Sequence, residues 1–305
     1  MLRSKSASAA LFLGVVCGTA VFGAAPRPSP AAPRPAAATP PATLAGLLSG
    51  LRDTAKALEP TAGMRLGYEE ILRKNGLTAA GLPYGDFVAV RLLFEATRDA
   101  GLWNLQWRIT NREPRSDEIW KQWRQVTAPT TLEPTATAEC DELSALFAFL
   151  THSLGVQGVG LFWPTYNHTV AVWQIRTSTR PPVRVVVPTS QIFLAETDRF
   201  GTDRFDPWRQ RTIVDYTRRD AAADLRLPPA LLAFFLRQAK RYAGATDDAL
   251  QRLRYLREAV FQARLTPAQA ATLARRARRE AAMLRAPQED LAAFDAFVAD
   301  MNAAP

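Results

Sequence analysis

Apolar side chains recur at helical spacing over much of the chain. From Leu44 to Leu51 leucines follow the i, i+3, i+4, i+7 rule, and residues 43–58 are therefore predicted to form an amphipathic helix. The same reasoning predicts three more helices before residue 126, at residues 66–74, 86–99 and 115–125. From about residue 228 to the end the pattern is helical again, with breaks at Gly244, Pro267 and Pro287.

The middle of the chain changes from helical to strand periodicity. A helical register that begins near Leu143 stops at Gly155, and it predicts a helix over residues 138–153. Short β-branched or alternating runs follow, and they predict an antiparallel sheet with strands at residues 156–162, 169–175 and 183–187. Because helices and strands occupy separate stretches of the chain, the expected fold class is α+β.

The N-terminal segment has the three-part order of a secretory signal peptide. A basic start with Arg3 and Lys5 precedes an apolar run over residues 9–25, which ends in small side chains. A membrane-spanning helix needs about 20 apolar residues, and this run is shorter. We therefore expect residues 1–25 to be a signal peptide and the protein to be exported, to the periplasm or the extracellular space. An uncleaved N-terminal anchor is the alternative. A Pro/Ala-rich linker follows at residues 26–42.

Composition excludes several classes of function. The chain has 305 residues, two cysteines and a formal net charge of +9. Two cysteines cannot build a disulfide framework, and no CxxC, P-loop, GxGxxG or HExxH pattern occurs, so neither a metal nor a cofactor is expected.

The densest charge cluster runs from Arg275 to Arg279, on a predicted amphipathic helix whose apolar positions include Leu273, Ala277 and Leu284. It is either a solvated face or a weak contact with an anionic surface of the cell envelope. Nucleic acid is not expected as a partner, because the protein is expected to be exported.

Cys17 lies in the signal segment, so Cys140 is the cysteine expected in the mature chain. Thr137 is the expected N-cap of the following helix, which places Cys140 in the first turn. There the helix dipole lowers the pKa of a thiol and favours the thiolate, whereas the carboxylates of Asp141 and Glu142 oppose it.

Two histidines are available as a base for this thiol. His152 lies on the same predicted helix, about 18 Å along its axis from Cys140, and is interpreted as a group at the helix C-terminus. His168 lies at the start of the predicted strand at residues 169–175. If that strand packs against the helix that carries Cys140, it would bring His168 to the sulfur. A nucleophile at a helix start with a base at a strand start is the arrangement of papain-like cysteine enzymes.

Two motifs here resemble the transglutaminase-like superfamily, whose core is papain-like. The stretch from Ala138 to Val156 resembles the family's nucleophile helix, with a small-x-Cys start and a Leu-Gly end, and the stretch from His168 to Trp173 resembles its histidine strand. The resemblance implies a transglutaminase-like domain at residues 43–215, followed by a C-terminal helical region at residues 216–305. It implies acyl transfer or amide hydrolysis on a protein or peptide, such as a cell-wall peptide, without a cofactor.

The family's third catalytic group is an acid at the end of the following strand. Simple alignment places Val187 there, and a valine cannot accept a hydrogen bond from an imidazole. A side-chain oxygen of Thr189, Ser190 or Gln191 is expected to orient His168 instead, as an amide does in papain-like proteases.

Several roles stay open at this point. Other acids that could orient the histidine are Asp198, Asp203 and Asp206, and candidates by residue type for the oxyanion-stabilising group are Trp107, Gln122 and Trp123. If nothing replaces the acid, the alternative is a catalytically impaired fold that acts as a binding or structural module of the envelope. Neither the substrate nor the oligomeric state follows from the sequence.

Overall fold

The computed structural model describes residues 42–110, 115, 117–165, 168–176, 181–190, 214–215 and 225–304. The predicted signal peptide, nearly all of the linker, Gln191 and the aspartates at 198, 203 and 206 lie outside these residues. Within the described ranges no helix is both long enough and apolar enough to cross a membrane.

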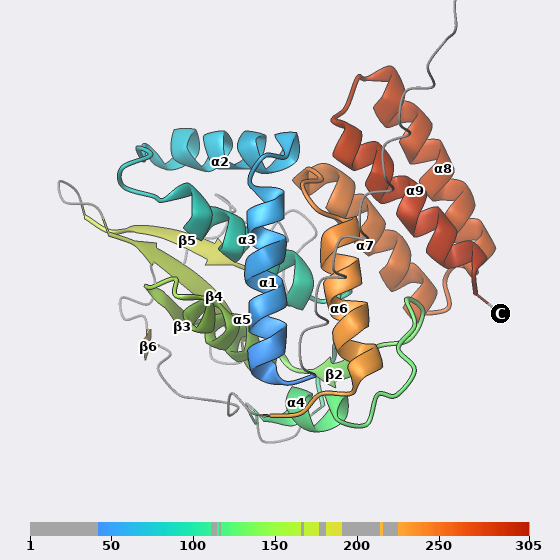
Figure 1. Ribbon diagram of the computed structural model, residues 1–305, viewed down its shortest axis with the longest axis horizontal. Coiled ribbons are helices and arrows are strands. Elements are labelled where there is room, and N and C mark those ends of the chain that lie inside the picture. Colours follow the sequence, from blue (N-terminus) through green and yellow to red (C-terminus); the bar gives the residue numbers. More distant parts are fainter. Residues whose placement is uncertain are drawn as a thin grey trace, which may run out of the picture. The chain divides into compact units, whose positions relative to one another are not determined.

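The helices of the described part include every helix that the apolar spacing predicts, with ends shifted by a few residues (Figure 1). In chain order they are α1 (Leu44–Leu58), α2 (Ala62–Asn75), α3 (Tyr84–Thr97), α4 (Glu118–Trp123), α5 (Cys140–Leu154), α6 (Pro229–Arg241), α7 (Asp247–Phe261), α8 (Pro267–Met283) and α9 (Gln288–Asn302). The expected breaks are confirmed, because Gly244 separates α6 from α7, Pro267 begins α8 and Pro287 caps α9.

The main sheet is antiparallel and has the strand order β5-β4-β3-β6 in the described residues. Its strands are β3 (Val159–Thr165), β4 (His168–Ile175), β5 (Val183–Val187) and β6 (Val214–Asp215). The three predicted strands are therefore confirmed. α5 contacts β3 and β4, so the cysteine helix packs on this sheet and the α+β class is confirmed.

The two faces of the sheet bury different side chains, because successive residues of a strand point to opposite sides. Ala171 and Val187 lie in the main hydrophobic core, which they share with α5. Val170 and Val172 lie in a separate small apolar cluster with Phe162 and Val186. The side that carries Ala171 is therefore the one that faces α5.

A second, two-stranded sheet is not predicted by the apolar spacing. Its strands, β1 (Leu105–Trp107) and β2 (Ala136–Ala138), are parallel and have three residues each, too short to show a periodicity. β2 ends immediately before the residue that caps α5, so this small sheet fixes where the cysteine helix begins.

The C-terminal helices share the main core with the N-terminal ones. The ring of Trp103 stacks on Phe235 of α6 with 4.5 Å between centroids, and Trp123 contacts the same ring edge-on. From α7, Arg257 donates hydrogen bonds to the carbonyls of Ala100 and Gly101 at 2.8 and 3.0 Å. The helical region after residue 216 thus supports the segment that leads into β1.

The apolar face of α8 differs from the expected one. Leu273 and Leu284 are exposed, and the buried residues are alanines, namely Ala270, Ala271, Ala274 and Ala277. Small side chains let α8 approach α9 closely, and these two helices make the most extensive contact between any two elements in the described part. The arginines from Arg275 to Arg279 still lie on an amphipathic helix, but its apolar stripe is alanine rather than leucine.

Replacing Gly63 by alanine is expected to destabilise the protein by about 3 kcal/mol. A Cβ at this position of α2 would lie 1.2 Å from the backbone oxygen of Gly244, so the backbone would have to move. Gly85 in α3 is the matched control, because a Cβ there finds its nearest neighbour at 3.8 Å. Urea unfolding should separate the two variants, and equal midpoints would contradict the close approach of α2 to the turn after α6.

Candidate functional site

The first turn of α5 is held by carboxylates rather than by the threonine that the sequence indicates. The N-cap is Glu139, and Thr137 belongs to β2, so the predicted Thr137 cap is wrong. Glu142 accepts a hydrogen bond from the Glu139 backbone N–H at 2.9 Å, and the Glu139 carboxylate accepts one from the Thr110 N–H at 2.6 Å. Cys140 is consequently the first residue of the helix.

The thiol of Cys140 is buried and its pKa is raised above the ordinary value of 9.0. Burial is the largest cause, and the neighbouring Asp141 carboxylate adds to it. Backbone N–H groups of Thr169 and Asp141 act in the opposite direction, since hydrogen bonds to a thiolate favour it. The expected opposition of Asp141 is confirmed, but the expectation of a lowered thiol pKa at the helix start is wrong because burial outweighs the dipole.

His168 is the first residue of β4 and is 2% exposed. Burial lowers the pKa of its imidazole to about 4. The next residue, Thr169, supplies the N–H group that acts on the Cys140 sulfur, so the start of this strand lies at the start of α5. Strand alternation places the His168 side chain on the same side of the sheet as Val170, whereas α5 packs on the side that carries Ala171.

The residue opposite His168 follows from the pairing of β4 with β5. The pairs Ala171–Val187 and Val172–Val186 fix the register of β4 against β5, and the same register continued three residues beyond the end of β5 would set His168 against Ser190. Ser190 is buried, and its hydroxyl has no hydrogen-bond partner among the described residues. Val187, three residues before Ser190, is fully buried in the main core.

Thr189 links the cysteine helix to the end of β5. Its buried hydroxyl shares a 2.9 Å hydrogen bond with that of Ser144, which lies one turn after the cysteine. The Ser144 hydroxyl also contacts the Cys140 carbonyl oxygen at 2.7 Å, and the Thr189 carbonyl accepts from the Asp99 N–H at 2.8 Å. Among the described contacts, Thr189 therefore positions α5. Gln191, the other predicted orienting group, lies outside the described residues.

The sequence motifs did not single out Ser144 or Thr169. Ser144 follows Cys140 by four residues, a spacing that places both on one face of a helix, and this was an available signal. The role of the Thr169 backbone had no such signal, because any residue type supplies an N–H group.

His152 and the three candidates for the oxyanion-stabilising group all make hydrogen bonds that hold neighbouring segments of the fold in place. The ring of His152 lies 3.0 Å from the Val159 carbonyl oxygen in the last turn of α5, as its interpretation as a helix C-terminal group requires. Gln122 bonds the backbone N–H and carbonyl of Thr137, both at 2.8 Å, and thereby holds β2. The other two candidates also hold this region: Trp123 donates to Thr135, and the Trp107 N–H donates to Asp99.

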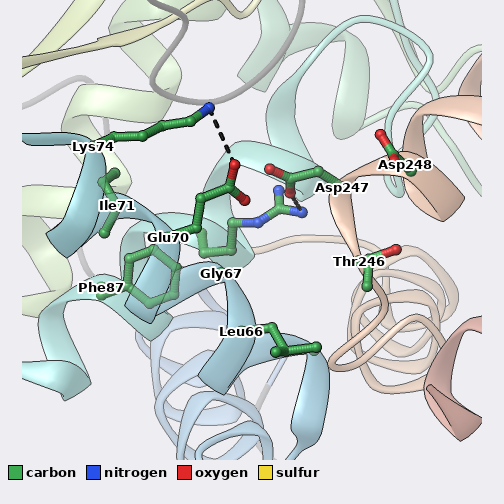
Figure 2. Close-up of a pocket in the computed structure, with 11 residues that line it drawn as sticks. Leu66, Gly67, Glu70, Ile71, Lys74, Phe87, Thr246, Asp247 and Asp248 are labelled. Carbon is green, nitrogen blue, oxygen red and sulfur yellow. Dashed lines mark ion pairs between the residues drawn. The ribbon is translucent and has the colours of Figure 1, made fainter. Parts of the chain in front are cut away.

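A separate pocket of about 290 Å³ lies between α2, α3 and the start of α7 (Figure 2). Four of its charged groups form two ion pairs: Lys74 lies 3.1 Å from Glu70, and Arg91 pairs with Asp247. Leu66 and Phe87 line the rest of the pocket. The pocket holds neither a cysteine nor a histidine, so the thiol chemistry of the described part lies at the start of α5.

No group of three or more His, Cys, Asp or Glu side chains in the described residues is arranged to hold a metal ion. The chemistry that the site can support rests on the thiol, the imidazole and the backbone N–H groups. No family model, no curated protein and no solved structure matches this chain.

Replacing His168 by glutamine is expected to change how stability depends on pH. The unfolded chain takes up a proton near pH 6.5, whereas the folded protein resists protonation until about pH 4. Native stability is therefore lost as the pH falls from 6.5 to 4, by about 3 kcal/mol, and the glutamine variant is expected to lack this loss.

The difference in free energy of unfolding between the variant and the native protein must be measured at each pH. The reason is that Asp99 changes the stability of both proteins in the opposite direction as the pH falls. Burial raises the pKa of Asp99 to about 6, so its contribution to stability grows as the pH falls through that value. Urea unfolding at several pH values gives the difference. A constant difference across this range would contradict a buried, neutral His168.

Proposed function

We propose that the chain is an exported transglutaminase-like protein that performs thiol-dependent acyl transfer or amide hydrolysis at Cys140, with His168 as its base. The observation that supports this most is the convergence of two elements at one sulfur. The N–H of Thr169 from β4 and that of Asp141 from α5 both act on Sγ, so the histidine strand begins where the cysteine helix begins. The order of nucleophile helix and histidine strand matches the resemblance in the sequence.

The reaction starts from a neutral thiol and a neutral imidazole, because burial raises the thiol pKa and lowers that of His168. As Sγ attacks the substrate carbonyl carbon, the S–H proton passes to His168 and the carbonyl oxygen takes the negative charge. Backbone N–H groups at the start of α5 stabilise that oxyanion. The C–N bond then breaks, the leaving amine takes the proton from His168, and a thioester remains on Cys140.

The second half of the reaction regenerates the thiol. Water or a second amine attacks the thioester carbon and gives its proton to His168, and the departing sulfur takes that proton back. Water gives hydrolysis and an amine gives transfer. The substrate class we propose is a protein or peptide amide, as in a cell-wall peptide, with no cofactor.

A non-catalytic binding or structural module is the second candidate, and Val187 favours it. The position where the family has its acid holds an apolar side chain that is fully buried in the main core. A histidine with a pKa of about 4 is also a weak base. In this alternative the fold is the same, but the imidazole of His168 does not deprotonate the thiol of Cys140.

Exposure of the protein to a peptide p-nitrophenyl ester at neutral pH separates the two candidates. Acyl transfer predicts release of p-nitrophenol and a matching mass increase on the tryptic peptide that contains Cys140. Peptide-level detection distinguishes this cysteine from Cys17. A folded protein that releases no p-nitrophenol beyond the uncatalysed rate and carries no acyl group on Cys140 would support the binding module and contradict the enzyme.

A further inference from the structure

Arginines and apolar side chains gather on the outer face of α8 and on the turn that follows it. Thr272, Arg275, Arg276, Arg279 and Met283 follow one another at i, i+3, i+4, i+7 and i+11, so they form one stripe along the helix. This stripe lies opposite the buried alanines that pack on α9. Every arginine in it is exposed, and so is Arg285 in the turn.

The end of this stripe is apolar. Met283 is 76% exposed and Leu284 is 81% exposed, and both lie where α8 passes into the turn toward α9. Leu273, also on α8, is 42% exposed. Of the five large hydrophobic side chains that are exposed in the described part, these three belong to α8 and its end, so their grouping differs from the single exposed leucines of an ordinary surface.

Only some of these arginines form ion pairs within the protein. Arg276 pairs with Glu280 at 3.0 Å, and Arg278 ties α8 to α9 through Asp295 at 2.7 Å. Arg275 contacts only the Thr272 hydroxyl, at 3.1 Å, among its described polar neighbours. No carboxylate of the described residues lies within ion-pair distance of Arg275, Arg279 or Arg285. Their charge is therefore open to an anionic partner.

We propose that this surface, formed by Arg275, Arg276, Arg279, Met283, Leu284 and Arg285, docks the protein on membranes that contain anionic phospholipids. Guanidinium groups bind phosphate oxygens in a bidentate manner. Met283 and Leu284 beside them enter the boundary between headgroups and acyl chains, as the apolar side of an interfacial helix does. A soluble polyanion would use the arginines but would gain nothing from the exposed methionine and leucine, which is why a lipid surface is the partner that fits both.

Sedimentation of the full-length protein with vesicles tests the proposal. Binding to vesicles of phosphatidylglycerol mixed into phosphatidylcholine is expected to exceed binding to pure phosphatidylcholine and to weaken as salt is added. Because one arginine near an anionic surface contributes about fivefold in binding, the double variant Arg275→Gln/Arg279→Gln is expected to bind about 25-fold more weakly. The variant Met283→Ser/Leu284→Ser is expected to bind more weakly while keeping the salt dependence.

The matched control is Lys56→Gln/Arg73→Gln, which removes two exposed charges from α1 and α2 and is expected to bind like the native protein. Unchanged thermal midpoints show that each variant is folded. Equal binding to both vesicle types, or equal loss in the control, would overturn the proposal. So would competition by soluble polyphosphate with no effect of the Met283/Leu284 substitutions, because that result identifies a general polyanion site. None of these outcomes bears on the thiol site, since α8 contributes no residue to it.

Discussion

Replacing Glu95 by alanine is expected to destabilise the folded protein by about 3–5 kcal/mol. Glu95 is buried in α3 and lies 2.5 Å from Arg91 and 3.2 Å from Arg98, both of which are also buried. Burial alone raises the pKa of Glu95, but the guanidinium groups of Arg98 and Arg91 outweigh it, and the pKa is lowered. Removing the carboxylate leaves two buried cations without their shared partner.

Urea unfolding measures this loss, and Asp117→Asn is its control. Asp117 pairs with Lys121 at 2.8 Å across one turn of α4, but both side chains are well exposed, so breaking this pair is expected to cost less than about 1 kcal/mol. A loss below about 1 kcal/mol for Glu95→Ala would show that the buried carboxylate is not what neutralises the two arginines.

A further variant shows whether the destabilisation of Glu95→Ala comes from the lost charge or from the lost side-chain packing. Replacing the triad as a whole, with Glu95→Leu, Arg91→Met and Arg98→Met, removes all three buried charges together. Such a replacement is expected to recover most of the stability lost in Glu95→Ala, because no buried cation remains without a partner. The side chain of Asp247, which pairs with Arg91, is partly exposed.

Replacing Cys140 by alanine is expected to abolish acylation by a peptide p-nitrophenyl ester, with a fall of at least about 1000-fold in the rate of p-nitrophenol release. The serine variant is expected to be nearly as inactive, because the base would have to activate an alcohol rather than a thiol. Cys17→Ser is the matched control, since it removes the other cysteine of the chain. An ester that is cleaved equally by the native and Cys140→Ala proteins would contradict a nucleophilic Cys140.

The sequence predicted the helices and strands well because their apolar spacing is regular. The register from Leu143 onward identified the cysteine helix, and the alternating run after His168 identified its neighbouring strand. The cap of that helix was wrong because β2 extends to Ala138 and two glutamates take the place of the usual threonine. A strand of three residues leaves no periodic signal that would reveal this.

The electrostatics of the site could not be predicted from the sequence, because burial depends on distant segments. The dipole at the start of α5 indicated a low thiol pKa, yet packing of Cys140 beneath β4 raises it. The bond between Ser144 and Thr189 joins residues 45 positions apart, so no local motif shows it. The same holds for Arg91 and Glu95, whose spacing suggests an exposed helix pair but which lie buried.

The central claim is that His168 serves Cys140 as its base. The rate at which Cys140 is acylated by the peptide p-nitrophenyl ester tests it, compared between the native protein and His168→Gln at neutral pH. A base in the transition state contributes about 10²–10⁴-fold, so a fall of at least about 100-fold is expected, with the variant folded by circular dichroism and its thiol still titratable after unfolding. Equal acylation rates in the two proteins would contradict the claim and leave Cys140 a buried thiol without a catalytic partner.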